Sequence, residues 1–254
     1  FQRTASTQFG ELYFPRERSN EAAKYVYLDG RKVPAGSAAV GSGDWYSTLM
    51  FTDWALKFVD DARSQNKPFF LYIAHGAPHF PLKAPGEVIA RYRGKYRAGW
   101  DQLREDRYAR QKEMGIIGGD TPLSPRPGDV PAWDSLSAEE QDRFDQIMAV
   151  YAAMIDCIDQ SVGRMVQGLR QRGMLENTLL LFLSDNGGNA ESGPPGITEG
   201  DPPGGPDSKV FLGMCWATLN NTPFRRYKHF THEGGIATPL IAHWPAGIPA
   251  ERNG

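Results

Sequence analysis

A short apolar run, residues 179–183, ends at two side chains that carry oxygen, Asp185 and Asn186, and two glycines follow them. An apolar run without alternation predicts a strand that is buried on both faces of a sheet. In open α/β folds, ligand sites lie at the carboxyl ends of such strands. A carboxylate beside an amide oxygen suits Ca²⁺ or Mg²⁺. The same residues also make an ordinary turn, so the rest of the chain must distinguish the two interpretations.

Helices and strands alternate along the chain. Apolar residues at helical spacing predict a helix over residues 44–65 and a longer one behind a capping box at Ser137. Residues 69–74 and 239–244 predict two more strands, the first buried on both faces. Residues 86–115 predict two charged helical pieces broken near residue 99, with a solvated face. This alternation predicts a layered α/β fold with a mostly parallel sheet flanked by helices.

Three segments show no clear period. Residues 1–43 predict loops and short edge strands. Residues 120–131 and 187–209 are rich in Gly and Pro, which predicts irregular structure. The second of these follows the ligand-bearing strand, and a long irregular segment in that place is expected to form the wall of a site.

Composition excludes several classes of protein. The 254 residues are 40% hydrophobic and 23% charged, which is typical of a globular chain. The net charge is -2 without a dense basic block, so neither nucleic acid nor an anionic membrane is expected as a partner. No apolar stretch approaches the ~20 residues of a membrane span. No charged-then-apolar leader follows Phe1, so we expect either that a leader was removed or that the sequence is an excerpt of a longer reading frame.

The two cysteines form neither a disulfide framework nor a zinc cluster. Cys157 lies on an apolar helical stripe, which predicts a buried thiol. A single bridge between Cys157 and Cys215 is left open by the sequence, and so is the redox compartment.

Three polar clusters lie beside the predicted strands. They contain His79, the Asp185-Asn186 pair and Lys228. If the strands are parallel, the first two clusters meet at one edge of the sheet, and the third is a loop that could fold over them. A metal, a histidine and a lysine would together hold a tetrahedral oxyanion. Taken singly, His79 between prolines also fits a structural loop, and Lys228 also fits a surface lysine.

The remaining histidines are expected to be structural. His75 is predicted to cap backbone groups at the end of its strand. Structural rather than catalytic roles are also expected for His229, His232 and His243.

Several motifs resemble the sulfatases of the alkaline phosphatase superfamily, most of all the bacterial arylsulfatases. Their order and spacing agree over roughly residues 44–247. The motifs are residues 67–72, 77–82 and 84–85, residues 151–154 with Asp159 and 162–164, residues 177–188, and residues 222–225, 227–228 and 233–235.

The resemblance implies roles for four residues. His79 matches the histidine that contacts the sulfate ester and helps to protonate the leaving oxygen. Asp185 and Asn186 match two ligands of the family's divalent cation, usually Ca²⁺, with Mg²⁺ possible. Lys228 matches the lysine that binds the sulfate. It further implies a small-molecule or saccharide sulfate ester as substrate and a periplasmic or secreted location.

One part of the family pattern is missing. The family nucleophile is a formylglycine made in a Cys/Ser-x-Pro-x-Arg motif, and this motif does not occur in the chain. The amino-terminal acidic metal ligands and the Gly-Lys-x-His motif do not occur either. The resemblance therefore implies that residues 1–254 are the later part of a sulfatase catalytic domain, inactive alone. A phosphate or phosphonate ester hydrolase and a noncatalytic anion-binding remnant remain alternatives.

Overall fold

The computed structural model describes residues 2–7, 13–15, 25–41 and 45–249. The chain forms two units. Unit 1 contains residues 1–91, 150–171 and 199–210, and unit 2 contains residues 92–149, 172–198 and 211–254. The longest helix, α4 (Ala138–Gln171), contributes residues to both. No helix in the described ranges is long and apolar enough to cross a membrane.

Unit 1 begins with an antiparallel sheet of three short strands in the order β1-β2-β3. The strands are β1 (Ala5–Thr7), β2 (Tyr25–Leu28) and β3 (Arg31–Pro34). Val26 of β2 packs in a small core with Trp45 and with Met50 of helix α1 (Ser47–Ser64). The short strands predicted within residues 1–43 and the helix predicted over 44–65 are both confirmed.

The helical part of unit 1 is joined by polar contacts between α1 and α4. Arg164 of α4 forms an ion pair with Asp53 of α1. One turn away, the hydroxyls of Thr52 and Ser161 lie 2.6 Å apart and are both buried. The short helix α2 (Gly86–Ala90) completes the unit.

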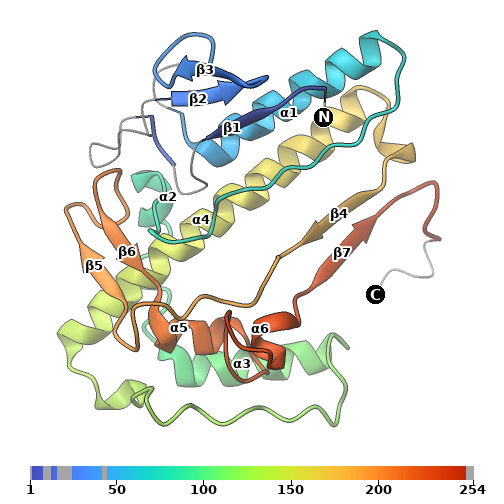
Figure 1. Cartoon of the computed structure of the whole chain (residues 1–254). Helices are drawn as coiled ribbons and strands as arrows, with labels where there is room; N and C mark the ends of the chain where they lie inside the picture. Colours follow the sequence, from blue (N-terminus) through green and yellow to red (C-terminus); the bar gives the residue numbers. More distant parts are fainter. Residues whose placement is uncertain (1, 8–12, 16–24, 42–44, 250–254) are drawn as a thin grey trace. The chain divides into compact units, whose positions relative to one another are not determined.

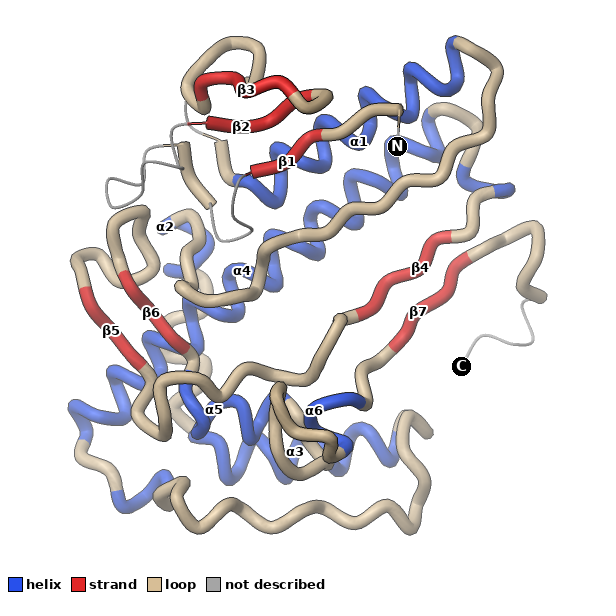
Figure 2. Tube along the Cα trace, in the orientation of Figure 1, coloured by secondary structure: helices blue, strands red, loops and turns tan. Residues whose placement is uncertain are grey.

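The strand predicted over residues 69–74 is wrong. This segment runs as a loop (Figure 2), and no strand of the described residues pairs with it. Phe70 and Tyr72 are 78% and 72% exposed. An apolar segment is buried only where other segments pack against it. Within the described part of the chain, no strand pairs with residues 69–74.

Unit 2 is built around aromatic rings. Trp100 of α3 (Gly99–Glu113) contacts Trp133, Phe144 and Trp216 edge to face, with centroids 4.8, 4.9 and 5.4 Å away. Trp216 lies on α5 (Gly213–Asn220), and its indole donates to the carbonyl of Phe144 over 2.9 Å. The remaining helices are the 3-10 helices η2 (Trp133–Ser135) and η3 (Leu175–Asn177) and the short helix α6 (Glu233–Ile236).

Two sequence predictions about helix boundaries are confirmed. The Ser137 hydroxyl accepts from the Glu140 amide over 3.2 Å, and the Glu140 carboxylate accepts from the Ser137 amide over 2.8 Å, which is a capping box. The break near residue 99 separates α2 from α3. Gly99 has φ +76°, and a Cβ there would lie 2.1 Å from the Trp133 ring.

Unit 2 also contains the pair β4 (Leu180–Leu183) and β7 (Leu240–His243), which lie side by side in Figure 1. The two strands are antiparallel, with Leu180 opposite His243 and Leu183 opposite Leu240. The α/β class is confirmed, whereas parallel pairing is wrong for these strands. Parallel and antiparallel partners both satisfy the backbone hydrogen bonds of a strand. The sequence pattern alone therefore could not distinguish the two directions.

The burial predicted for the strand at residues 178–184 is also wrong. In β4 and β7, Phe182, Leu183 and Leu240 are 46%, 57% and 62% exposed. The region 187–209 is largely irregular as predicted, except that β5 (Ile197–Glu199) pairs with β6 (Lys209–Phe211).

Candidate functional site

The end of β4 presents Asp185 and Asn186 in a turn held by local hydrogen bonds. The Thr238 hydroxyl donates to the carbonyl of Ser184 over 2.8 Å, and the Ser184 hydroxyl donates to the carbonyl of Asn186 over 2.9 Å. Asn186 Nδ2 donates to the carbonyl of Gly187 over 2.9 Å. Because the amide nitrogen is used by the backbone, Oδ1 is the atom that Asn186 offers to a cation. Asp185 is exposed and Asn186 is half-buried.

The two glycines after this turn allow direct contact between backbones. The Gly187 amide donates to the carbonyl of Gly235 over 3.0 Å. A Cβ on Gly187 would lie 1.8 Å from the carbonyl oxygen of Gly234, and a Cβ on Gly234 would lie 2.1 Å from that of Arg226. Such contacts exclude any side chain, so glycine is required here for steric reasons.

Lys228 is attached to the same turn. Its amide donates to the carbonyl of Gly188 over 3.1 Å. The preceding residue, Tyr227, is buried, and its hydroxyl lies 2.9 Å from Thr218 Oγ1. Burial raises the pKa of Tyr227 above its ordinary value. In unit 2 the backbone of Lys228 is therefore bonded to Gly188, two residues after Asn186 in the turn that carries Asp185 and Asn186.

His79 lies in unit 1, in a loop anchored by a buried tyrosine. The Tyr13 hydroxyl contacts the carbonyls of Gly76 and His79 at 2.9 and 2.7 Å. The His79 ring places Nδ1 2.8 Å from the carbonyl of Phe80. A carbonyl only accepts, so Nδ1 carries the hydrogen of this bond. That His79 meets Asp185 and Lys228 stays a prediction.

His75 is not a backbone cap, contrary to the prediction. Its Nε2 lies 3.1 Å from the hydroxyl of Ser161, which in turn contacts Thr52. Thr52 donates to the carbonyl of Thr48 over 2.8 Å, so Ser161 must donate to Thr52 and His75 Nε2 must donate to Ser161. Burial lowers the pKa of His75 to about 4. The ring is therefore neutral and structural.

This low pKa predicts a loss of stability in mild acid. The unfolded chain binds a proton at His75 near pH 6.5, whereas the folded chain binds it only near pH 4. The contribution of His75 to the free energy of unfolding is therefore fully present above pH 6.5. It falls by at most about 3 kcal/mol as the pH drops to about 4. We expect His75→Gln to remove this part of the pH dependence.

Urea titrations at pH 7 and pH 4 measure the effect. His243→Gln, on an exposed residue of β7, is the matched control and should keep the acid-dependent loss of the unmodified chain. An equal loss in the His75 and His243 variants would contradict the assignment of the low pKa to His75.

Two polar residues of this region were not predicted from the sequence. Glu191 Oε1 lies 2.8 Å from His229 Nε2, and the Asn221 side chain bonds to the backbone of both loops of the site. Neither residue belongs to a periodic pattern. Asn221 stands directly before the motif at residues 222–225, and this proximity is the only signal that the sequence offered. His232, by contrast, contacts Arg225 at the surface.

The side chains fit part of a calcium site. Asp185 and Asn186 supply two hard oxygen ligands, which is the chemistry that Ca²⁺ prefers. No group of three or more acidic, His or Cys side chains gathers around a possible metal in the described ranges. The described residues therefore offer two ligands, and Ca²⁺ takes 6–8 oxygens in all.

The cysteines do not contribute to a site. Cys157 and Cys215 are both buried and free. Burial raises the pKa of each thiol to about 12, so neither is a thiolate at neutral pH. The predicted burial of Cys157 is confirmed, and the pairing that the sequence left open does not occur.

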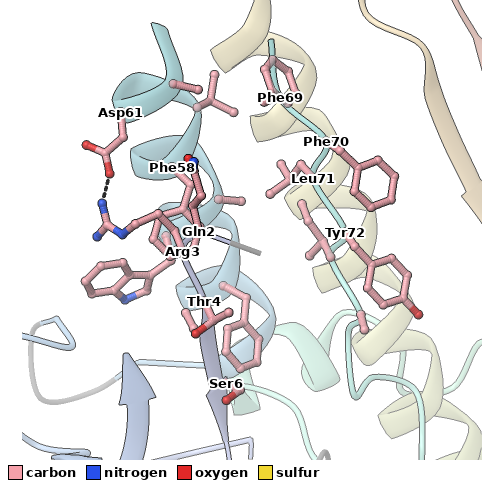
Figure 3. Close-up of a pocket in the computed structure, with 18 of the residues that line it drawn as sticks. Gln2, Arg3, Thr4, Ser6, Phe58, Asp61, Phe69, Phe70, Leu71 and Tyr72 are labelled. Atoms are coloured by element: carbon pink, nitrogen blue, oxygen red, sulfur yellow. Dashed lines mark hydrogen bonds and ion pairs between the residues drawn. The ribbon is translucent and has the colours of Figure 1, made fainter. Parts of the chain in front are cut away.

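Unit 1 has a groove of about 760 Å³ between α1, β1 and residues 67–76. Leu71 points toward the α1 side of this groove, whereas Phe70 and Tyr72 point away from it (Figure 3). Arg3 and Asp61 form an ion pair at its edge. None of the four predicted site residues lines the groove.

Comparison with known proteins identifies similar chains. A family model described as "Sulfatase" matches residues 8–254. An arylsulfatase of Klebsiella aerogenes is 36% identical over 232 residues, which are 87% of this chain and 48% of that protein. An uncharacterised sulfatase of Schizosaccharomyces pombe is 35% identical over 217 residues, 80% of this chain and 39% of that protein.

Solved structures show the same fold. The structure of Ps i-CgsB in complex with k-i-k-neocarrahexaose has a TM-score of 0.59 and 23% identity, covering 98% of this chain and 41% of that one. A putative sulfatase, yidJ of Bacteroides fragilis, has a TM-score of 0.50 and 18% identity, covering 88% and 36%. The chain thus spans less than half the length of the relatives named here.

Proposed function

Because the chain belongs to the sulfatase family, we propose that it carries part of the active site of a sulfuric ester hydrolase. The observation that carries this proposal is the attachment of Lys228 to the Asp185-Asn186 turn, through the Lys228 amide and the Gly188 carbonyl 3.1 Å apart. A cation bound by the Asp185-Asn186 pair and the ammonium group of Lys228 would both attract a negatively charged ester. The proposed substrates are aryl or saccharide sulfate esters.

Asp185 and Asn186 are proposed to hold a divalent cation, Ca²⁺ or alternatively Mg²⁺, together with ligands from outside this chain. The bound cation would supply positive charge against the sulfate oxygens. Lys228 would neutralise a further sulfate oxygen through its ammonium group. With both ring nitrogens protonated, His79 would give the Nε2 proton to the leaving oxygen and become neutral, while Nδ1–H stays bonded to the Phe80 carbonyl.

The nucleophile is proposed to be a formylglycine from a segment outside this chain, since the 254 residues contain no Cys/Ser-x-Pro-x-Arg motif. We therefore propose that residues 1–254 are the later part of a sulfatase catalytic domain. Two observations support this: the chain spans 39–48% of the curated relatives described above, and several large apolar residues of β4, β7 and 69–74 are exposed. A periplasmic or secreted location is proposed from the family alone.

The proposal is tested with the protein joined to the preceding part of its gene product and expressed with formylglycine maturation. We expect hydrolysis of an aryl sulfate that is lost with a chelator and restored by Ca²⁺. Lys228→Ala should lower kcat/KM by about 100-fold, since removing one preorganised charge contact typically has an effect of this size.

Lys112→Ala is the matched control, because Lys112 is also half-buried and also lies in unit 2. It should leave kcat/KM unchanged within about twofold, as surface substitutions usually do. Faster hydrolysis of an aryl phosphate than of the sulfate would favour a phosphate or phosphonate esterase. Anion binding without turnover of any ester would favour a noncatalytic remnant.

A further inference from the structure

We propose that Asn221 is a positioning residue that fixes Lys228 against the Asp185-Asn186 turn. The inference rests on the function proposed above, because it assigns Asn221 a role in the same site. Asn221 does not itself need to touch the substrate.

The Asn221 side chain bonds to both segments at once. Its Oδ1 accepts from the Gly188 amide over 2.7 Å, and its Nδ2 donates to the Arg226 carbonyl over 2.9 Å. Gly188 stands two residues after Asn186, and Arg226 stands two residues before Lys228. One amide group therefore sets the distance between the proposed cation ligands and the proposed sulfate-binding lysine.

A third hydrogen bond closes the arrangement. The Lys228 amide donates to the Gly188 carbonyl over 3.1 Å, so Gly188 is bonded on both sides. A Cβ on Gly188 would lie 3.2 Å from Asn221 Oδ1, which shows how closely the side chain approaches the turn. Rotation of either segment would break at least one of these bonds.

Asn221 is itself held rigidly. It is the C-cap of α5, its amide donates to the Ala217 carbonyl over 3.1 Å, and it is only 9% exposed. A buried residue at this place must offer one donor and one acceptor in a short planar group, and asparagine does so. Aspartate would keep the acceptor for Gly188 but would turn a second acceptor toward the Arg226 carbonyl.

The test is a double-mutant cycle in the active enzyme. We expect Asn221→Ala to lower kcat/KM about 10-fold or more, which is the usual effect of losing an outer-shell partner of a metal site. In the Lys228→Ala background the same substitution should add less than about twofold, because residues that act through one another are not additive. Fully additive losses would overturn the proposal.

Thr222→Val is the matched control for stability. The Thr222 hydroxyl donates over 2.7 Å to the Leu219 carbonyl, so this variant loses one buried hydrogen bond at the end of α5, where Asn221→Ala loses two, and it loses no bond to either loop. Its Tm should fall because of the lost bond, whereas its kcat/KM should stay within about twofold. An equal loss of activity in both variants would show that Asn221 is only structural.

Amide hydrogen exchange on this chain gives a readout that does not depend on activity. Asn221→Asp should speed exchange at Lys228 more than 10-fold, while the amides of α5 keep their protection. Unchanged exchange at Lys228 would overturn the inference by itself. If Lys228→Ala instead kept full activity, the proposed function would fail, and the exchange data would still test the positioning by Asn221.

Discussion

Asp185→Ala in the active enzyme is expected to lower kcat by about 1000-fold, more than the 10–100-fold typical of outer-shell partners, because it removes a direct ligand. The carboxylate is the only charged group in the turn that follows β4. Without it, the cation loses its charged ligand in this segment, and Asn186 alone offers a neutral oxygen. The variant should also need much higher Ca²⁺ for half-maximal rate.

A Ca²⁺ titration of the rate measures both effects. Asp134→Ala is the control, because Asp134 is an exposed carboxylate of η2 in the same unit and removes the same charge. It should behave like the unmodified enzyme. The metal assignment fails if the Asp185 variant keeps the unmodified Ca²⁺ dependence and rate.

Gly187→Ala is expected to destabilise the protein by about 4 kcal/mol, in the range reached when a rigid backbone contact is overfilled. The added Cβ would lie 1.8 Å from the Gly234 carbonyl oxygen. The Cβ is fixed to the backbone of residue 187 and the oxygen belongs to the backbone of Gly234, so neither can move away without moving its loop. The hydrogen bond from Gly187 to Gly235 would be lost with it. Urea unfolding of the chain measures the change.

Gly163→Ala in α4 is the control for this substitution. Nothing lies within 4 Å of a Cβ at Gly163, so alanine fits there without conflict. Since alanine favours the helix, this variant should gain about 0.5–1 kcal/mol. Similar unfolding midpoints for the two variants would contradict the close approach of the two loops.

The helices could be predicted from the sequence because their signals are local. In α4 the capping box and the apolar stripe lie within the same 34 residues, and each residue contacts neighbours three or four places away. The strands could be located but not paired. The apolar run at residues 69–74 says that the segment is suited to burial, but the residues that would bury it are not among its neighbours in sequence.

The sequence indicated which residues to consider for the site, but not the contacts that join their segments. His79 and Asp185 were expected to meet at one edge of a parallel sheet, with the Lys228 loop folded over them, whereas residues 69–74 form no strand and β4 and β7 are antiparallel. The structure joins their loops through glycine backbone and the side chain of Asn221. Such hydrogen bonds between distant segments leave no periodic trace, so no local pattern could have indicated them.

The open strands β4 and β7 govern how this polypeptide must be handled. Leu183, Leu240 and Ile241 form an exposed apolar surface, and within the described residues the outer edges of the two strands pair with no further strand, which favours association between chains. Produced alone, the polypeptide calls for dilute samples monitored by light scattering. Without that precaution, aggregation would be mistaken for poor folding or for weak ligand binding.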